Sequence, residues 1–112
     1  AVYGGCDPVD IATRHGVRVR YVHLKDADAT ELQRVRSTSI TMQEAWRRGV
    51  FCALGQGVVD FKGVATALAA RNYQGWMIVE QDVVPDEDGR FTQDPAQNAV
   101  ESRTYLREEL GL

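Results

Sequence analysis

Two helices are predicted near the ends of the chain, each opened by an aspartate followed by proline. Asp7-Pro8 and Asp94-Pro95 place an N-cap acid before a proline at the first helical position, where the missing N–H costs nothing. Apolar positions then recur on one face of each segment. Gly16 is expected to end the first helix in the left-handed conformation, and Gly111 is expected to end the second.

Two further helices are predicted in the middle of the chain. The longer one begins after Asp60, follows an i, i+3, i+7 apolar pattern and ends near Asn72. The shorter one begins after Thr41, which has capping-box spacing to Glu44, and ends at Gly49.

Two segments have the composition of strands. Residues 17–24 are rich in β-branched and aromatic side chains, and residues 76–80 form a short apolar run that suits a strand buried on both sides. The order helix, strand, small helix, helix, strand, helix predicts parallel strands covered by helices. Residues 25–60 form a connection far longer than the usual βα loop of about 2–6 residues. Such long loops most often shape an active site, and the alternative is a surface loop with no role in a site.

The length and charge of the chain limit the classes of protein it can belong to. With 112 residues it is expected to form one domain, residues 1–112, and it cannot be a complete (β/α)₈ barrel, which needs about 250. A net charge of -3 provides no basic field for nucleic acid or an anionic membrane. No apolar run approaches the about 20 residues that span a bilayer. The start lacks signal-peptide features and there are only two cysteines, so a cytoplasmic protein with reduced thiols is expected.

Strand alternation predicts that four ionisable side chains gather at one sheet edge. On one face of each predicted strand, two apolar or aromatic residues are followed by two ionisable ones. These are Val19, Tyr21, His23 and Lys25 on the first strand, and Trp76, Ile78, Glu80 and Asp82 on the second. The carboxyl edge of parallel strands is where α/β proteins place their ligands. If the two strands are neighbours, the four ionisable side chains converge.

An imidazole and a carboxylate at this edge form part of a site for a divalent metal ion. His23 and Glu80 suit Mn²⁺, Co²⁺, Zn²⁺ or Fe²⁺, but two ligands are fewer than such ions require. The alternatives are a hydrogen-bonded core histidine and an ion pair between Glu80 and Lys25 or an arginine. Beside a metal ion, Lys25 would have a lowered pKa and could move protons; otherwise it pairs with Asp26 or Asp82.

Two weaker signals lie in the long connection. The spacing of Gly55-Gln56-Gly57 falls short of a phosphate-binding loop, which favours a tight turn before Asp60. Cys52 follows Phe51 in an apolar segment, which favours a side chain buried in the core over a nucleophile.

Three segments together resemble a known family of enzymes. His23-Leu24-Lys25-Asp26, residues 49–61 and residues 73–82 are similar to the myo-inosose-2-dehydratases, members of the sugar-phosphate isomerase/epimerase group with the xylose-isomerase-like barrel. The likeness covers nearly the whole chain, although the family more often has glycine where Cys6 stands.

The resemblance implies an α/β fold that is the C-terminal part of a (β/α)₈ TIM barrel. By position, His23 matches a histidine ligand on the seventh strand, and Glu80 matches the final glutamate ligand on the eighth. The family's other two ligands, a glutamate and an aspartate, belong to earlier strands. The chain is therefore expected to correspond to the last third of a barrel, with half of a metal site, and to be inactive alone.

The resemblance also implies a lyase that dehydrates an inosose to a trihydroxycyclohexanedione with a divalent metal ion, Mn²⁺ or Co²⁺ first and Zn²⁺ or Mg²⁺ as alternatives. The expected catalytic residues are Glu80 and Lys25, and the expected contacts to the small polyol or keto-sugar substrate are Lys25, Asp26, Phe51, Gln56 and Asp82.

One alternative is a ketose or sugar-phosphate isomerase or epimerase. Residues 28–30 count against a 3-epimerase, because other branches place an arginine in this stretch. A second alternative is a binding or assembly module. A DNA-repair nuclease is poorly supported, because the net charge of the chain is negative.

Two parallel strands with a few helices cannot bury both sheet faces, and they leave strand edges with unpaired N–H and C=O groups. We therefore expect either pairing with the rest of a barrel or another copy of the chain, or a partial barrel with an exposed apolar inner face.

Overall fold

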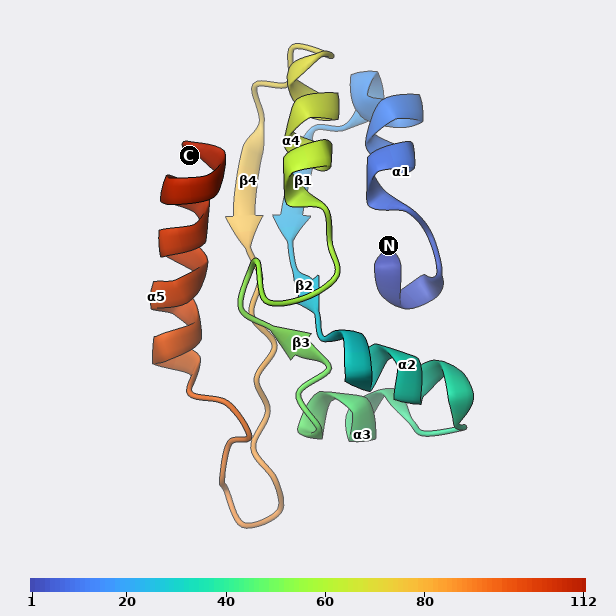
Figure 1. The fold of residues 1–112 in the computed structure, drawn as a ribbon, viewed down its shortest axis with the longest axis vertical. Coiled ribbons are helices and arrows are strands. Elements are labelled where there is room, and N and C mark those ends of the chain that lie inside the picture. Colours follow the sequence, from blue (N-terminus) through green and yellow to red (C-terminus); the bar gives the residue numbers. More distant parts are fainter.

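The computed structural model describes all residues, 1–112, and shows an α/β arrangement with two small sheets (Figure 1). The elements in chain order are η1 (Val2–Gly4), α1 (Pro8–His15), η2 (Gly16–Arg18), β1 (Tyr21–Leu24), β2 (Asp26–Ala27), α2 (Ala29–Ser37), α3 (Met42–Arg47), β3 (Phe51–Cys52), α4 (Phe61–Ala69), β4 (Trp76–Val79), α5 (Pro95–Tyr105) and η3 (Leu106–Leu110). Here η1 and η2 are 3₁₀ turns and η3 is a π-helical turn.

The helix starts predicted from the sequence are confirmed by their caps. The side chains of Asp7, Asp60 and Asp94 each accept a hydrogen bond from a backbone N–H in the first turn of α1, α4 and α5. Thr41 does the same for α3, through the N–H of Glu44. Gly111 ends the C-terminal helix with a φ of 68°, as predicted.

The prediction for Gly16 is wrong, because this residue has a right-handed φ of -51° and continues into η2. A Cβ at this position would lie 2.8 Å from Cγ of Arg71, so close packing, not a left-handed turn, is what favours glycine here. The first strand is also shorter than predicted, since η2 occupies residues 16–18.

The two longer strands, β1 and β4, are parallel neighbours (Figure 1). Their register pairs Tyr21 with Trp76 and His23 with Ile78, and the Glu80 N–H extends the pairing by donating to Leu24 O at 2.9 Å. One face of this sheet is covered by α1 and α4, where Ala12, Val64 and Leu68 form a cluster with Val22 and Met77. Val19 packs into the same cluster, so the prediction that Val19 shares a face with His23 is wrong.

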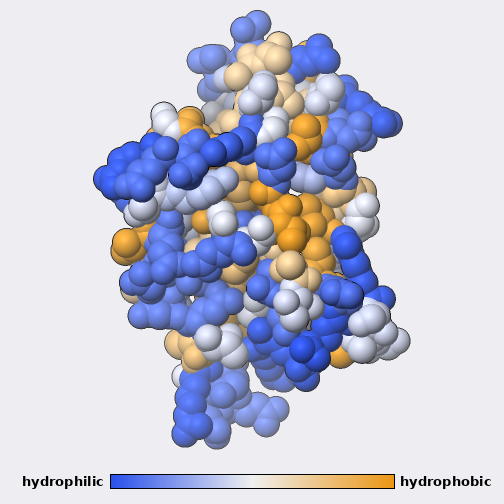
Figure 2. All heavy atoms as spheres, viewed as in Figure 1, coloured by the Kyte–Doolittle hydropathy of each residue, from blue (hydrophilic) through white to orange (hydrophobic).

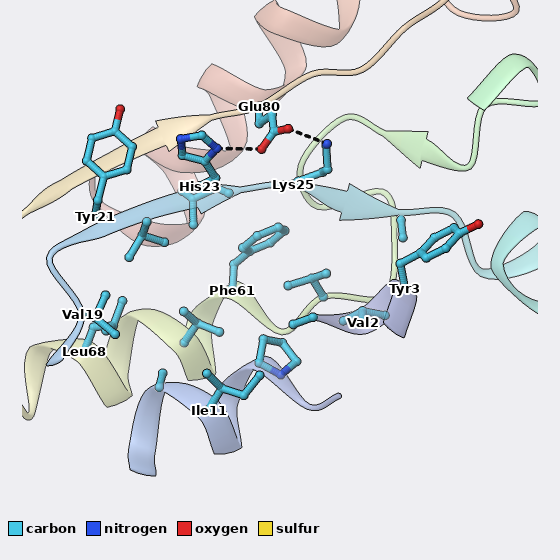
Figure 3. A pocket seen from close by; sticks show the side chains of 18 of the residues that line it. Val2, Tyr3, Ile11, Val19, Tyr21, His23, Lys25, Phe61, Leu68 and Glu80 are labelled. Atoms are coloured by element: carbon cyan, nitrogen blue, oxygen red, sulfur yellow. Dashed lines mark hydrogen bonds and ion pairs between the residues drawn. The ribbon is translucent and has the colours of Figure 1, made fainter. Parts of the chain in front are cut away.

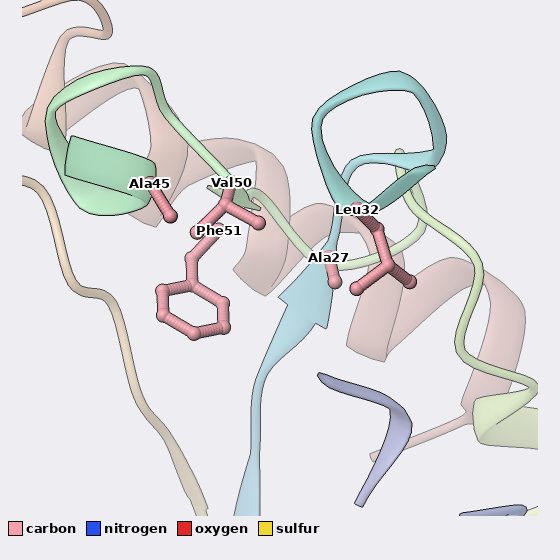
Figure 4. Close-up of a cluster of buried hydrophobic side chains, with 5 residues drawn as sticks. All are labelled: Ala27, Leu32, Ala45, Val50 and Phe51. Carbon is pink, nitrogen blue, oxygen red and sulfur yellow. The ribbon is translucent and has the colours of Figure 1, made fainter. Parts of the chain in front are cut away.

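The long connection contains two elements that the sequence analysis did not predict. One is α2, capped by Asp28, whose side chain accepts from the Glu31 N–H at 2.9 Å. The other is the short antiparallel pair of β2 and β3, which aligns Asp26 with Cys52 and Ala27 with Phe51. Around this pair, Ala27, Leu32, Ala45, Val50 and Phe51 form a second core cluster (Figure 4).

Helix α5 is attached to the same region by polar contacts. The Leu54 N–H donates to Ser102 Oγ at 3.0 Å. Just before α5, the amide nitrogen of Gln93 donates to the carbonyl oxygens of Gly49 and Phe51 at 3.1 and 2.9 Å. These contacts hold β3 from the side of α5.

The opposite face of the β1–β4 sheet is largely open. Tyr21 and Trp76 lie on it with 56% and 73% of their surface exposed. Only 18 of 112 residues are buried, and the buried hydrophobic side chains form separate small clusters. The Cα radius of gyration of 14.7 Å exceeds the about 13 Å of a compact domain of this length. The structure therefore shows the partial barrel with an exposed apolar inner face that the sequence predicted.

Candidate active site

Four ionisable side chains meet at the carboxyl ends of β1 and β4, as strand alternation predicts. His23 Nδ1 lies 2.8 Å from Glu80 Oε2, and Lys25 Nζ donates to Glu80 Oε1 at 2.6 Å. Lys25 Nζ also donates to Asp82 Oδ2. In Figure 3, His23 and Glu80 lie on one side of the strands, with Phe61 and Leu68 of α4 on the other. The site therefore faces what is the inside of a barrel in this fold.

Two aromatic side chains border this cluster. The Phe51 ring centroid lies 4.4 Å from Lys25 Nζ, a distance at which the ring face attracts the ammonium group. The Tyr21 and His23 rings lie 5.2 Å apart in a tilted arrangement. Tyr21 was not predicted as a site residue, although its position two residues before His23 on the same strand face could have indicated it.

The charges of the cluster shift the pKa values of two of its members. Burial acts to lower the pKa of Lys25, but the hydrogen bonds to Asp82 and Glu80 outweigh burial and raise this pKa above its usual value. The hydrogen bond from Lys25, followed by that of His23, holds the pKa of Glu80 below its usual range. The lowered Lys25 pKa predicted from the sequence assumed a neighbouring metal ion, and the chain by itself has the opposite effect.

Two predicted substrate contacts lie away from the cluster. Asp26 is fully buried, and both of its carboxylate oxygens accept backbone N–H groups. Gln56 is exposed, and its amide nitrogen donates to Glu101 Oε2. Of the predicted site residues, the structure thus brings together His23, Lys25, Phe51, Glu80 and Asp82.

The turn at residues 55–57 forms as expected, and it does bind an anion, which is the Asp26 carboxylate of the same chain. Gly55 has a left-handed φ of 87°, and the N–H groups of Gly55 and Gly57 both donate to Asp26 Oδ2 at 2.9 Å. These donors are therefore already used within the fold.

A cavity of about 420 Å³ borders β1 and reaches the cluster, with side chains from both faces of the strand in its lining. It is lined mainly by apolar side chains of the N-terminal segment, α1, α4 and β1, with His23, Lys25 and Glu80 as its ionisable members. Figure 2 shows a hydrophobic patch near the middle of this view, bordered by hydrophilic residues. Because His23, Lys25 and Glu80 line the same cavity as many apolar side chains, the polar cluster adjoins apolar surface.

The chain itself offers two neighbouring metal ligands. An imidazole nitrogen and a carboxylate oxygen, from His23 and Glu80, are donor types that a divalent transition-metal ion accepts, and both side chains are partly exposed. No group of three or more His, Cys, Asp or Glu side chains is placed to hold a metal ion. The donor set thus fits part of a metal site, and it equally fits the ion pair between Glu80 and Lys25.

Parallel strands covered by helices, with ionisable side chains at their carboxyl ends, define this chain as part of an α/β barrel. The chain belongs to the xylose isomerase-like TIM barrel family, whose model matches residues 2–109. No solved structure gave a significant match. None of the helices has the length and apolar character required to cross a membrane.

Curated relatives of this chain are named inosose dehydratase. It is 37% identical to that of Geobacillus thermodenitrificans over 111 residues, covering 99% of this chain and 36% of the relative. It is 32% identical to that of Clostridium beijerinckii over 110 residues, covering 98% and 35%. It is 40% identical to that of Geobacillus kaustophilus over 85 residues, covering 76% and 28%. The chain therefore spans about a third of the length of these relatives.

Cys52 is buried in β3 next to Phe51, and its thiol is expected to be unreactive in the folded protein. Burial, followed by the nearby charges of Asp26 and Asp28, raises the pKa of Cys52 to about 12. Because the thiolate is the nucleophile, the reactive form of Cys52 is only about one part in 10⁴ of the thiol at pH 8. With a disulfide reagent at pH 8, we expect the exposed Cys6 to react quickly and Cys52 to react only after unfolding. Cys6→Ser should remove the fast phase and Cys52→Ser should leave it; equal native rates would contradict this assignment.

Proposed function

We propose that this chain is the C-terminal portion of an inosose dehydratase, a carbon–oxygen lyase that converts an inosose to a trihydroxycyclohexanedione. The observation that carries the proposal is the convergence of His23, Lys25, Glu80 and Asp82 at the carboxyl ends of two neighbouring parallel strands. The names of the relatives support the choice of reaction. The part of the barrel that the relatives carry and this chain does not span would complete the site.

In this proposal His23 and Glu80 are two of the ligands of a divalent metal ion, Mn²⁺ or Co²⁺ first and Zn²⁺ or Mg²⁺ as alternatives. When bound, such an ion supplies Lewis-acid polarisation of the substrate's ketone. The partly exposed imidazole and carboxylate can reorient from each other toward a shared ion without unfolding a buried core. The two remaining ligands would come from earlier strands of the barrel.

The reaction requires one proton to leave carbon and one to reach oxygen. A base removes the proton α to the ketone, and the electron pair of that C–H bond forms an enolate. The C–O bond of the β-hydroxyl then breaks, and the hydroxyl takes up a proton and leaves as water. The resulting enol tautomerises to the dione. Lys25 and Glu80 are the groups placed to move these protons, since Lys25 carries one at 2.6 Å from the Glu80 carboxylate.

The substrate would lie over the open face of β1 and β4. Asp82 can accept hydrogen bonds from its hydroxyl groups beside Lys25, and the Phe51 ring supplies an apolar wall beneath the ammonium group. Polyhydroxylated rings present both hydroxyl groups and apolar C–H faces, which this mixture of groups can recognise.

A chimaera tests the proposal directly. In it, this chain replaces the matching third of the Geobacillus thermodenitrificans inosose dehydratase. We expect the chimaera to retain metal and to convert inosose to the dione, measured by the absorbance of the product and by mass spectrometry. A folded, metal-containing chimaera that forms no dione would reject the proposal. Interconversion of ketoses without loss of water would instead assign the chain to an isomerase or epimerase.

A further inference from the structure

The best-defined polar site outside the candidate catalytic cluster is the carboxylate of Asp26. It is 0% exposed, yet it forms no ion pair with a lysine or arginine. Oδ1 accepts from the N–H groups of Ala27 and Val59 at 2.9 and 3.1 Å. Oδ2 accepts from those of Gly55 and Gly57, both at 2.9 Å. A buried carboxylate is tolerated only when its oxygens are fully hydrogen-bonded, and here four backbone donors meet that need.

These hydrogen bonds attach the loop that follows β3 to Asp26. Residues 53–59 join β3 to α4, and three of the four donors come from this loop. The Val58 N–H adds a bond to Ala27 O at 3.0 Å. Asp26 is also paired with Cys52 across β2 and β3, and the loop that its carboxylate holds begins at the next residue, Ala53.

Phe51 links this loop to the candidate catalytic cluster. Its ring is buried in the cluster of Ala27, Leu32, Ala45 and Val50, and its centroid lies 4.4 Å from Lys25 Nζ. Lys25 is the residue before Asp26, and its ammonium group lies between this ring and the carboxylates of Glu80 and Asp82. Cys52, which pairs with Asp26 across β2 and β3, joins Phe51 to the loop, and the Phe51 ring in turn faces the Lys25 ammonium group.

We propose that Asp26 is a positioning residue that sets the location of the Lys25 ammonium group by holding the 53–59 loop and, through it, the Phe51 ring. This assignment differs from the substrate contact predicted for Asp26, because its oxygens face the loop. It rests on the proposed function only in treating Lys25 as a catalytic group. The contacts themselves can be tested without any enzymatic activity.

The test compares Asp26→Asn with Asp28→Asn in the 112-residue chain by NMR. Asparagine keeps the size of Asp26 but turns one oxygen into an NH₂ group that faces N–H donors, so two of the four backbone hydrogen bonds to this side chain are lost. We expect the amide signals of Gly55, Gly57 and Val59 to shift and the ring-current displacement of the Lys25 ε-methylene protons by Phe51 to be lost. Asp28→Asn makes the same chemical change two residues away, where asparagine remains a good N-cap, and should leave Lys25 unchanged.

A second variant keeps the proposal falsifiable if Asp26→Asn does not fold. Phe51→Leu removes the ring but keeps the loop contacts, so the Lys25 signals should shift while those of Gly55 and Gly57 stay. If Asp26→Asn folds and Lys25 keeps its ring-current displacement, Gln93 and the core hold Phe51 without Asp26, and the proposal is wrong. If Phe51→Leu leaves the shift of the Lys25 ε-methylene protons unchanged, the ring does not face Lys25, and the proposal is wrong as well.

In an active chimaera, the same substitution separates positioning from binding. We expect Asp26→Asn to lower kcat by about 100-fold, the cost of a misplacement of about 1 Å, with a much smaller change in KM. A change confined to KM would make Asp26 a substrate contact and overturn the proposal. An inactive parent chimaera would count against the proposed function, while the NMR comparison would still decide the role of Asp26.

Discussion

Glu80→Gln is expected to lower kcat/KM for inosose by about 10³-fold or more in the active chimaera, within the range for loss of a group that moves protons. The substitution replaces the proposed carboxylate ligand by a neutral amide and removes the negative charge that pairs with both His23 and Lys25. We therefore expect the bound metal, measured by elemental analysis after dialysis, to fall together with the activity. The fold should be retained, since the Glu80 side chain is 36% exposed and its ion pair contributes at most about 1 kcal/mol.

Glu87→Gln is the matched control. It removes the same charge from an exposed position in the loop after β4, where Glu87 forms no ion pair with any side chain. It should leave activity and metal content unchanged. If Glu80→Gln changed only the free energy of unfolding, with metal and activity intact, Glu80 would be solely the ion-pair partner of Lys25. The ion pair between Glu80 and Lys25 in the structure is compatible with such a purely structural role.

The parts of the fold that were predictable are those fixed by local chemistry. An aspartate before a proline sets a helix start without help from distant residues, and both such starts form as predicted. Helix α2 has the same kind of signal, Asp28 three residues before Glu31, but it buries only Leu32 and therefore lacks a clear apolar pattern. The pair of β2 and β3 has two residues in each strand, too few for any periodicity, and forms because Phe51 enters a core cluster.

The candidate site was predictable for a similar reason and to a similar extent. Alternation along two strands places His23, Lys25, Glu80 and Asp82 on one face, and the parallel register brings them together. Asp26 lies next to Lys25 in the sequence, but its role depends on N–H groups from a loop about 30 residues further along. No local pattern indicates where that loop returns, so only the structure shows that the Asp26 carboxylate is occupied.

Gly57→Ala is expected to destabilise the chain by about 3 kcal/mol or more, and to lower Tm by about 15 °C or more. A Cβ at this position would lie 2.3 Å from Ala27 O and 2.3 Å from Asp26 Oδ1. One of these atoms is backbone, and the other belongs to a fully buried carboxylate, so neither can move aside cheaply. The loop must shift instead, which breaks the bond from the Gly57 N–H to Asp26 Oδ2 and adds the loss of a charge-assisted hydrogen bond.

Gly4→Ala provides the control for this clash, because a Cβ there meets no atom within 4 Å and the residue has no left-handed φ. Its free energy of unfolding in urea should stay within about 0.5 kcal/mol of the unchanged chain. The difference between the two alanine variants then measures the close approach of the loop to Asp26, independent of the lower flexibility of alanine in the unfolded state. Equal stabilities would mean that the 53–59 loop is not held closely against Asp26. The proposal that Asp26 positions Phe51 and Lys25 through this loop would then lose its support.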